Sequence, residues 1–284
     1  MSNIPLISRL SSTVIRILGC NPGPMTLQGT NTYLIGTGKK RLLLDAGDPS
    51  VSEYTNTLEK VLKEENVEIG TIIITHWHHD HIGGVPDVIR LNGMCEVTKF
   101  KRDDFPDEPL PGDTPMRFLV DKETIKTEGA TLTVHHTPGH TRDHIVLHLA
   151  EENALFSGDC ILGQGTAVFE DLHDYLKSLH LILQLKPDVI YPGHGPVLDD
   201  PIPSIKYYIE HRMKRESEIL TVLKKEINKS FTEMEIVKRI YTDTPEHLHA
   251  AAASNVFHHL TKLQKDGQVI EKDGKWSYAK KSQL

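Results

Sequence analysis

The feature that most constrains the fold is a cluster of histidine and aspartate that directly follows an apolar strand. The run Ile72–Ile74 reads as a buried strand, and the next residues hold four potential metal donors, His76, His78, Asp80 and His81. His76 and His78 can point the same way at the strand exit, while the other two donors reach round the turn. Imidazole and carboxylate are ligands that zinc accepts in catalytic sites. The alternative is a surface loop that happens to be rich in histidine.

Three further strand ends carry a donor of the same kind. His140 lies in the sequence Thr-Pro-Gly-His-Thr, Asp159 in Phe-Ser-Gly-Asp-Cys, and His194 in Tyr-Pro-Gly-His-Gly. The glycines beside these donors let the backbone approach a ligand closely. A lone histidine in a turn is usually just solvated, but three donors in one repeated context make coincidence improbable. Because the chain offers seven donors, too many for one tetrahedral zinc ion, we expect a site for two ions.

Length and composition indicate a soluble protein with two units. A chain of 284 residues exceeds the usual length of one domain, which favours one large domain plus a smaller one. Hydrophobic residues make up 38% and charged residues 25%, and no apolar run approaches the roughly 20 residues needed to span a bilayer, so we expect no membrane contact. Cys20, Cys95 and Cys160 show no C-x-x-C spacing, which indicates free thiols in a reducing compartment.

Strands and helices alternate over the first 200 residues. We expect helices over residues 54–65, 85–91 and 172–183, and an exposed loop rich in Pro and Asp over residues 101–115. The expected strands cover residues 14–18, 31–35, 41–45, 72–74, 96–99, 117–120, 131–134, 145–149, 154–157 and 189–191. This order predicts an α/β domain over residues 1–200, with two stacked mixed sheets and helices outside them.

Residues 201–284 have a different pattern. A long helix is expected over residues 204–229, and Thr232 with Glu235 offers a capping box for a short second helix. Thr244-Pro245 can start a third helix that Gly267 closes, and a small hairpin turns at Asp273-Gly274. Three helices and a hairpin are the order of a winged helix. Nucleic-acid contact and packing on the catalytic domain both stay open as its role.

Basic residues favour an anionic partner for this second unit. Residues 200–284 hold 15 Lys and Arg against 12 Asp and Glu, although a solvated surface explains this excess equally well. Four basic residues of the long helix, Lys206, Arg212, Lys214 and Arg215, motivate the hypothesis that this unit holds an RNA strand or completes the active-site wall.

The motifs and their order resemble those of the metallo-β-lactamase-like hydrolase superfamily, with Leu-Asp-Ala-Gly at residues 44–47 as the first motif. The resemblance implies an αββα sandwich followed by a winged-helix-like domain. It further implies the metal ligands: His76, His78 and His140 for one zinc ion, Asp80, His81 and His194 for the other, and Asp159 as a bridge. By the same resemblance, Asp45 orients one of the ligand histidines.

Segments 19–33, 75–78, 126–132 and 156–163 are similar to one family within that superfamily. That family is similar to soluble mitochondrial endoribonucleases that cut single-stranded RNA, which implies a zinc-dependent endoribonuclease of the mitochondrial matrix. The first 44 residues carry basic but no acidic side chains, as transit sequences do, although residues 14–18 already read as a strand. A cytoplasmic location therefore stays open.

The expected mechanism uses a hydroxide held between two zinc ions, because metal binding lowers the pKa of water toward roughly 7. Attack in line with the departing 3′-oxygen would leave 5′-phosphate and 3′-hydroxyl ends. Asp80 and Asp159 are the expected catalytic residues, with Asp80 helping to orient the hydroxide, and no side chain stands out as the general acid. The alternative function is that of a glyoxalase II-like thioesterase, which uses the same metal ligands.

Overall fold

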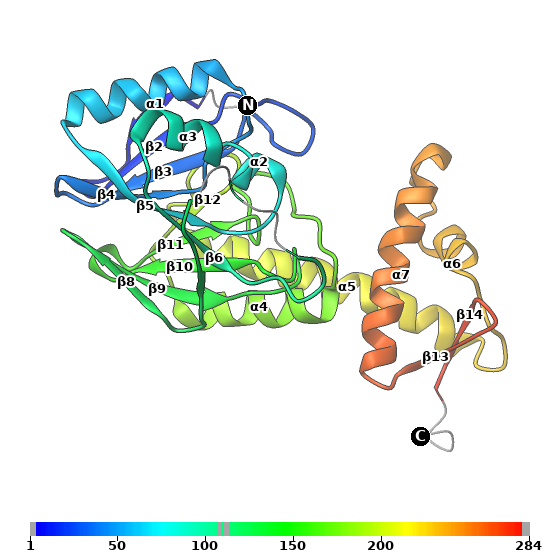
Figure 1. The fold of residues 1–284 in the computed structure, drawn as a ribbon. Helices are drawn as coiled ribbons and strands as arrows, with labels where there is room; N and C mark the ends of the chain where they lie inside the picture. Colours follow the sequence, from blue (N-terminus) through cyan, green and yellow to red (C-terminus); the bar gives the residue numbers. More distant parts are fainter. Residues whose placement is uncertain (1–3, 107–109, 111–113, 280–284) are drawn as a thin grey trace.

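Two β-sheets lie face to face in the larger part of the molecule, and helices cover the outer face of each (Figure 1). This is the α/β sandwich expected from the sequence. The computed structural model describes residues 4–106, 110 and 114–279, so residues 107–109 and 111–113 of the expected loop over residues 101–115 lie outside the described residues. Residues 101 and 103–106 are exposed, as expected for a loop.

The first sheet has seven strands whose order in space follows their order in the chain. These strands are β1 (Ile7–Arg9), β2 (Val14–Leu18), β3 (Asn31–Ile35), β4 (Lys40–Leu44), β5 (Glu68–Ile74), β6 (Glu96–Phe100) and β7 (Met116–Leu119). Pairing is antiparallel from β1 to β4 and parallel from β4 to β7. A parallel pair needs a crossover, and three helices serve two of these connections: α1 (Ser52–Glu65), α2 (His79–Ile82) and α3 (Val85–Asn92).

The second sheet has five strands in the order β12-β11-β10-β9-β8. Their bounds are β8 (Thr124–Thr127), β9 (Ala130–His136), β10 (Ile145–Leu149), β11 (Ala154–Gly158) and β12 (Val189–Pro192), with the short helix η1 (Ala150–Glu152) after β10. Only the pair of β11 and β12 is parallel within this sheet, and helix α4 (Leu172–Leu185) makes its crossover. The end of β11 and the end of β12 therefore lie at the same edge.

Apolar side chains fill the space between the sheets and also the space under the helices. On β3, Tyr33 and Ile35 face the second sheet, whereas Leu34 faces the layer of α1 and α3. Tyr33 meets the ring of Phe156 edge-on with centroids 5.1 Å apart, and its hydroxyl donates to the carbonyl of Pro192 at 2.7 Å. Because both faces of β3 are buried, residues 33–35 form a continuous apolar run without alternation.

The C-terminal unit has three helices and a hairpin, as the sequence predicts. Its elements are α5 (Pro201–Lys225), α6 (Glu233–Ile240), η2 (Glu246–Leu248), α7 (His249–Lys265), β13 (Val269–Lys272) and β14 (Lys275–Tyr278). Thr232 and Glu235 form the expected capping box at the start of α6. No helix in the described part of the chain is long and apolar enough to cross a membrane.

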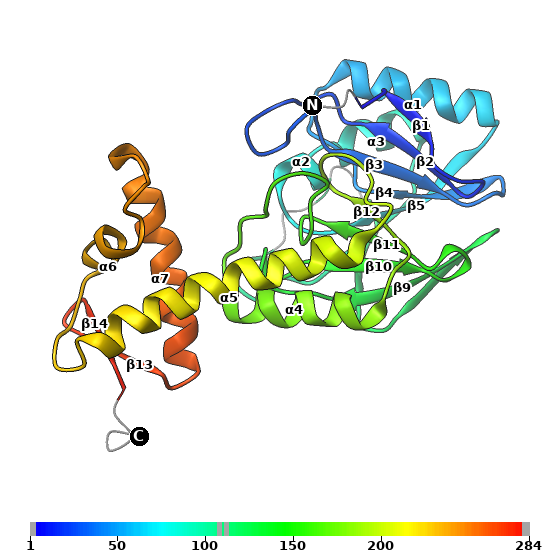
Figure 2. The same ribbon diagram turned by 180° about the vertical axis from the view of Figure 1, so that it is seen from behind.

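Helix α5 belongs to both units of the molecule (Figure 2). Ile205 and Tyr208, near its start, pack with α4 in the apolar layer under the second sheet. Ile219 and Leu223, near its end, lie in the core of the C-terminal unit. The division at residue 200 stays a prediction, and α5, which begins directly after it at Pro201, packs in the cores of both units.

Candidate metal centre

All seven predicted donors meet at one edge of the sandwich. They come from the ends of β5, β11 and β12 and from the turn between β9 and β10, so the two sheets bring together positions far apart in the sequence. The donors fall into two groups, one with His76, His78, His140 and Asp159, the other with Asp80, His81 and His194. The histidines and Asp80 divide as the resemblance to the superfamily implied, and Asp159 lies with the first group.

In the first group three ring nitrogens face one another. His76 Nε2 lies 2.9 Å from His78 Nδ1, and His140 Nε2 lies 3.2 Å from the former and 3.1 Å from the latter. The rings of His76 and His140 are almost wholly buried, with 1% and 3% of their surface exposed. These short separations put all three nitrogens around a single point.

The hydrogen bonds on the far side of these rings show why a cation fits there. The Thr75 hydroxyl donates to Asp45, so it must accept from His76 Nδ1 at 2.9 Å, and His140 Nδ1 donates to the carbonyl of Val168 at 2.8 Å. With the proton on Nδ1, each Nε2 carries only a lone pair. Lone pairs that converge without a shared proton repel one another, and a metal ion at their centre removes that repulsion.

The second group has the same arrangement around a carboxylate. Asp80 Oδ2 lies 3.3 Å from His81 Nε2 and 3.2 Å from His194 Nε2, and these two nitrogens are 3.4 Å apart. His81 Nδ1 donates to Asp45 at 2.8 Å, which leaves its Nε2 free to bind a metal ion.

Asp159 lies between the groups. Its Oδ2 is 3.3 Å from His194 Nε2 and 3.6 Å from His140 Nε2, and its Oδ1 is 3.4 Å from His81 Nε2. One carboxylate thus touches histidines of both groups, as a bridging ligand does. The cluster suggests a site for two metal ions, while the part each residue plays as a ligand stays a prediction.

Asp45 supports both groups at once. Its carboxylate accepts from the backbone N–H of Thr75 at 2.8 Å, from the hydroxyl of Thr75 at 2.9 Å and from His81 Nδ1 at 2.8 Å. Through Thr75 it also fixes His76, so it orients one ring in each group. The sequence comparison implied one such ring, and the structure shows a second.

Three polar residues that support the donors have no clear signal in the sequence. The hydroxyl of Thr30 donates to Asp80 at 2.9 Å and accepts from Asn21 Nδ2 at 3.1 Å. The backbone N–H of Asp159 donates to Nε2 of the buried His144 at 3.1 Å. His144 is one of 17 histidines, and only the pairing of β10 with β11 distinguishes it, so residue type alone cannot identify it.

Electrostatics favour the protonation states that bind cations in part of the cluster. Burial holds the pKa of His76 and His140 below the ordinary value and lowers that of His78 to about 4, so these rings are neutral at pH 7. Burial opposes ionisation of Asp80 and Asp159, but the neighbouring histidines outweigh it and hold the pKa of both carboxyls low.

His81 and His194 behave in the opposite way. Burial alone would lower their pKa values, but Asp45, Asp80 and Asp159 outweigh it for His81, and Asp159 and Asp80 raise the pKa of His194 to about 9. The carboxylates thus favour positive charge in this group. A metal ion can take the place of those protons, so binding it releases protons.

A cleft of about 510 Å³ lies over the donors. Two loops contribute to its walls, one at residues 24–27 and the other at residues 162–168. Met25 and Val168 expose 62% and 52% of their surface on these walls. Among the described residues that line the cleft there is no Lys or Arg.

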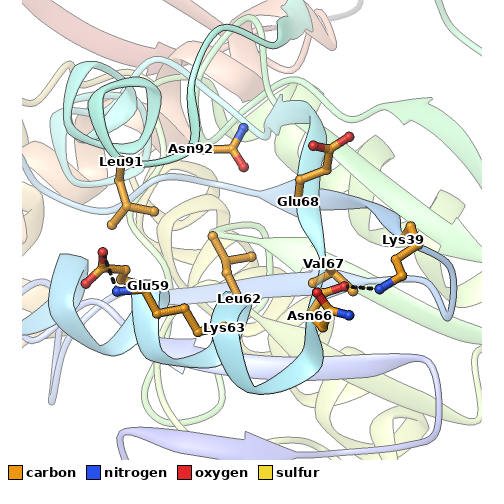
Figure 3. Close-up of a pocket in the computed structure, with 9 residues that line it drawn as sticks. All are labelled: Lys39, Glu59, Leu62, Lys63, Asn66, Val67, Glu68, Leu91 and Asn92. Carbon is orange, nitrogen blue, oxygen red and sulfur yellow. Dashed lines mark hydrogen bonds and ion pairs between the residues drawn. The ribbon is translucent and has the colours of Figure 1, made fainter.

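A second cleft, of about 670 Å³, lies away from the donors between α1, α3 and the start of β5 (Figure 3). Its polar groups pair with one another: Lys39 donates to the carbonyl of Asn66 at 2.8 Å, and Lys63 pairs with Glu59 at 2.8 Å. The cleft also holds none of the histidine and aspartate donors that meet at the metal centre, so it is not taken as the candidate active site.

Residues 25–194 match the model of the Metallo-beta-lactamase superfamily, and residues 232–276 match that of the Beta-lactamase associated winged helix domain. The chain therefore belongs to the metallo-beta-lactamase superfamily, as its motifs predict. It is 52% identical over 274 residues to the Beta-lactamase-like protein 2 homolog of Drosophila melanogaster, which covers 95% of this chain and 94% of the relative. The relative of the same name from Caenorhabditis elegans is 49% identical over 272 residues, covering 95% and 90%.

A solved structure of a beta-lactamase domain protein from Burkholderia ambifaria is similar to this chain with a TM-score of 0.78. The match covers 98% of this chain and 96% of that chain at 19% sequence identity. At this identity the likeness shows the shared fold, including the C-terminal unit, and nothing finer.

Proposed function

We propose that this chain is a zinc-dependent endoribonuclease that hydrolyses phosphodiester bonds in single-stranded RNA. The observation that carries the proposal is the pair of donor groups, joined by Asp159, at the floor of an open cleft. Two bound ions would neutralise charge on a phosphodiester and lower the pKa of a water toward roughly 7. The residues of the chain would hold these ions and orient the attacking water.

Asp159 and Asp80 have distinct tasks in this proposal. Asp159 contacts histidines of both groups, so it fixes the separation of the two halves of the site. Asp80 is held by Thr30 at the cleft floor and stays ionised, so it can orient the attacking water. Among the described lining residues outside the donor cluster there is no carboxylic acid, histidine or lysine, so we propose that the departing 3′-oxygen takes its proton from solvent.

The proposed chemistry predicts the ends of the products. Water as the nucleophile makes the 2′-hydroxyl unnecessary, so cleavage should leave 5′-phosphate and 3′-hydroxyl ends. Mass spectrometry of the fragments tests this, and a 2′,3′-cyclic phosphate among early products would contradict it. An RNA with a 2′-O-methyl group at the cut should still be cleaved, more slowly only as far as the methyl group disturbs binding.

The substrate class is tested by comparing four substrates under the same conditions: single-stranded RNA, duplex RNA, single-stranded DNA and S-lactoylglutathione. We expect cleavage of single-stranded RNA. The Asp159→Asn variant is the control, because loss of the shared carboxylate should abolish any activity that belongs to this site. Cleavage that survives in this variant would come from a contaminant.

A glyoxalase II-like thioesterase is the second candidate, and one observation favours it. The described lining residues around the donors are largely apolar and include no Lys or Arg, which suits an uncharged acyl group better than a chain of phosphates. Hydrolysis of S-lactoylglutathione without cleavage of any nucleic acid would replace the first proposal with this one.

Zinc and the mitochondrial matrix are proposals as well. His and Asp donors whose ligand atoms lie close together beside a cleft suit a catalytic zinc site, and elemental analysis should approach two zinc ions per chain. One ion, unchanged on zinc titration, would contradict this. The matrix location rests on the basic bias of the first 44 residues, yet Arg9 and Arg41 both pair with Glu65 in the fold. Protease protection in isolated mitochondria tests the location.

A further inference from the structure

The basic residues of α5 do not form one exposed surface. Arg212 is only 5% exposed, and Arg215 pairs with Glu218 at 2.7 Å while its guanidinium lies 3.9 Å from the ring centroid of Tyr241. Lys206 and Lys214 are exposed. The four basic residues on this helix motivated the hypothesis of an RNA-binding role, but Arg212 is buried and Arg215 is paired with Glu218. Arg212 instead points toward the catalytic domain.

Arg212 contacts the loop of residues 162–169, which forms one wall of the cleft. Its Nη2 donates to the carbonyl of Ala167 at 3.0 Å, and its guanidinium lies 4.7 Å from the ring centroid of Phe169. Phe169 also stacks on Tyr175 of α4, with centroids 5.3 Å apart and planes at 20°. The aromatic ring of Phe169 therefore contacts both helices.

Tyr208, one turn earlier on α5, holds the other end of the same loop. Its hydroxyl accepts from the backbone N–H of Leu162 at 3.1 Å and donates to the carbonyl of Gly165 at 3.0 Å. Only 3% of Tyr208 is exposed. A single buried hydroxyl thus satisfies one donor and one acceptor of a loop that makes few ladder hydrogen bonds of its own.

The loop in turn fixes a metal donor. The carbonyl of Val168 accepts from His140 Nδ1 at 2.8 Å, and it sits one residue beyond the carbonyl that Arg212 holds. This bond decides which nitrogen of His140 carries the proton and which way the ring turns. Displacement of the loop would move the carbonyl and release the ring.

Helix α7 adds a second contact from the C-terminal unit. His258 meets the ring of Phe169 with centroids 5.4 Å apart, and Lys265 pairs with Asp171 at the start of α4. The backbone N–H of Glu170 donates to the carbonyl of Gly139 at 2.7 Å, directly before His140. The wall loop therefore lies between the winged helix and the turn that carries His140.

We infer that Tyr208 and Arg212 are positioning residues for the metal centre: they hold the loop of residues 162–169 so that the Val168 carbonyl fixes His140. The C-terminal unit thereby completes the metal site through its first helix. The inference rests on the metal site of the proposed function but not on the substrate. It can fail while RNA cleavage holds, and it can hold if the substrate proves to be a thioester.

The test uses the full chain with Tyr208→Phe, which removes only the bonding hydroxyl, and Arg212→Met, which keeps the apolar stem. Hydrogen–deuterium exchange of the metal-free protein should rise over residues 162–169 in both variants. Zinc affinity, measured by competition with a chelating dye, should fall about tenfold, the low end of the range for residues that support ligands from behind.

Two control variants separate positioning from general destabilisation. Tyr207→Phe makes the same chemical change on a neighbouring side chain that is 57% exposed, and it should alter neither measurement. Ile219→Val weakens the C-terminal core away from the loop, and it should lower the melting temperature without lowering zinc affinity. Wild-type loop exchange or wild-type zinc affinity in a folded Tyr208→Phe protein would overturn the inference, even if Arg212→Met failed to fold.

Discussion

Asp45 combines a strained backbone conformation with three hydrogen bonds to its carboxylate. Its backbone lies in the left-handed region with φ 58°, which costs of order 1–3 kcal/mol for a residue other than glycine. Three hydrogen bonds to its carboxylate, from two atoms of Thr75 and from His81, offset that cost at about 1.5–3 kcal/mol each for a charged acceptor. The strained turn places one carboxylate where it can orient a ring in each donor group.

We predict that Asp45→Asn weakens metal binding in both groups. An amide has one accepting oxygen, so its NH₂ would face either the backbone N–H of Thr75, which displaces the segment that leads into His76, or both the Thr75 hydroxyl and His81 Nδ1, which misorients a ring in each group. Affinity for both ions should fall about 10–100-fold. Calorimetric titration of the metal-free protein measures this directly.

Asp87→Asn is the matched control, because Asp87 also accepts a backbone N–H, from Ser50 at 2.6 Å, but lies outside the donor network. It should leave both affinities unchanged. Loss of only one ion in Asp45→Asn, with the other bound as tightly as before, would show that Asp45 serves a single group.

The sequence identifies the seven donors because their residue types stand out in the turns that follow apolar strands. It cannot identify Thr30, or the Val168 carbonyl that fixes His140. Hydroxyl and backbone partners occur everywhere in a chain, so no residue type separates these from the rest. Their roles depend on which loops the sheets bring together, and that information exists only in the fold.

Among the elements, those with an apolar stretch are found where the sequence predicts them, and some with few buried side chains are missed. Strand β8 has one buried side chain, Ile125, and β1 has none, so neither carries a hydrophobic signal. Helix α2 is a single turn of four residues and holds three histidine or aspartate side chains. Strands β1 and β8 form because they pair with a neighbouring strand, and α2 forms as a local turn. Hydrophobic periodicity in the sequence does not reveal either cause.

Helix α7 contains a buried histidine that makes the C-terminal unit sensitive to acid. His259 has 0% exposure and neither ring nitrogen has a hydrogen-bond partner among the described residues. Burial, together with the positive charges of Arg212, Arg215 and Lys262, lowers its pKa to about 3. In the unfolded chain His259 binds a proton near pH 6.5, whereas in the folded chain its pKa is lower. Protons therefore favour the unfolded chain, and the free energy of unfolding falls as the pH drops below 6.5.

We predict that His259→Leu makes the C-terminal unit less sensitive to acid. Between pH 7.5 and 5.5 the wild-type unit should lose about 1.4 kcal/mol of unfolding free energy that the variant keeps. Urea unfolding followed by the fluorescence of Trp276 measures it, in a Trp77→Phe background that leaves Trp276 as the only tryptophan of the chain. Equal losses in the two proteins would mean that His259 is protonated in the folded state.

At the scale of the whole molecule, the order of a sandwich followed by a winged helix can be predicted from the sequence, but the joint between them cannot. The change in pattern near residue 200 indicates a boundary, whereas in the structure α5 begins there, at Pro201, and continues unbroken from the core under the second sheet into the core of the C-terminal unit. The sequence of a helix shows which positions are apolar, but it does not show which other residues they pack against. Ile205 and Leu223 look alike in the sequence, yet they lie in different cores.

The shared helix makes a prediction about truncation. A chain ending at residue 200 loses Ile205 and Tyr208, which are 0% and 3% exposed under the second sheet, and leaves α4 uncovered. Removing each buried side chain costs about 2–5 kcal/mol, against a total stability of about 5–15 kcal/mol for a typical domain. We expect this chain to be insoluble or to melt without cooperativity.

A chain ending at residue 226 keeps α5 and should behave differently. It retains Tyr208 and Arg212, and with Ile219→Gln and Leu223→Gln it exposes less apolar surface at the end of the helix. We expect a cooperative melt by circular dichroism and two zinc ions by elemental analysis. A chain of 200 residues that folds and binds two ions equally well would mean that the sandwich is complete without α5, and the winged helix would then be a separate module on a linker.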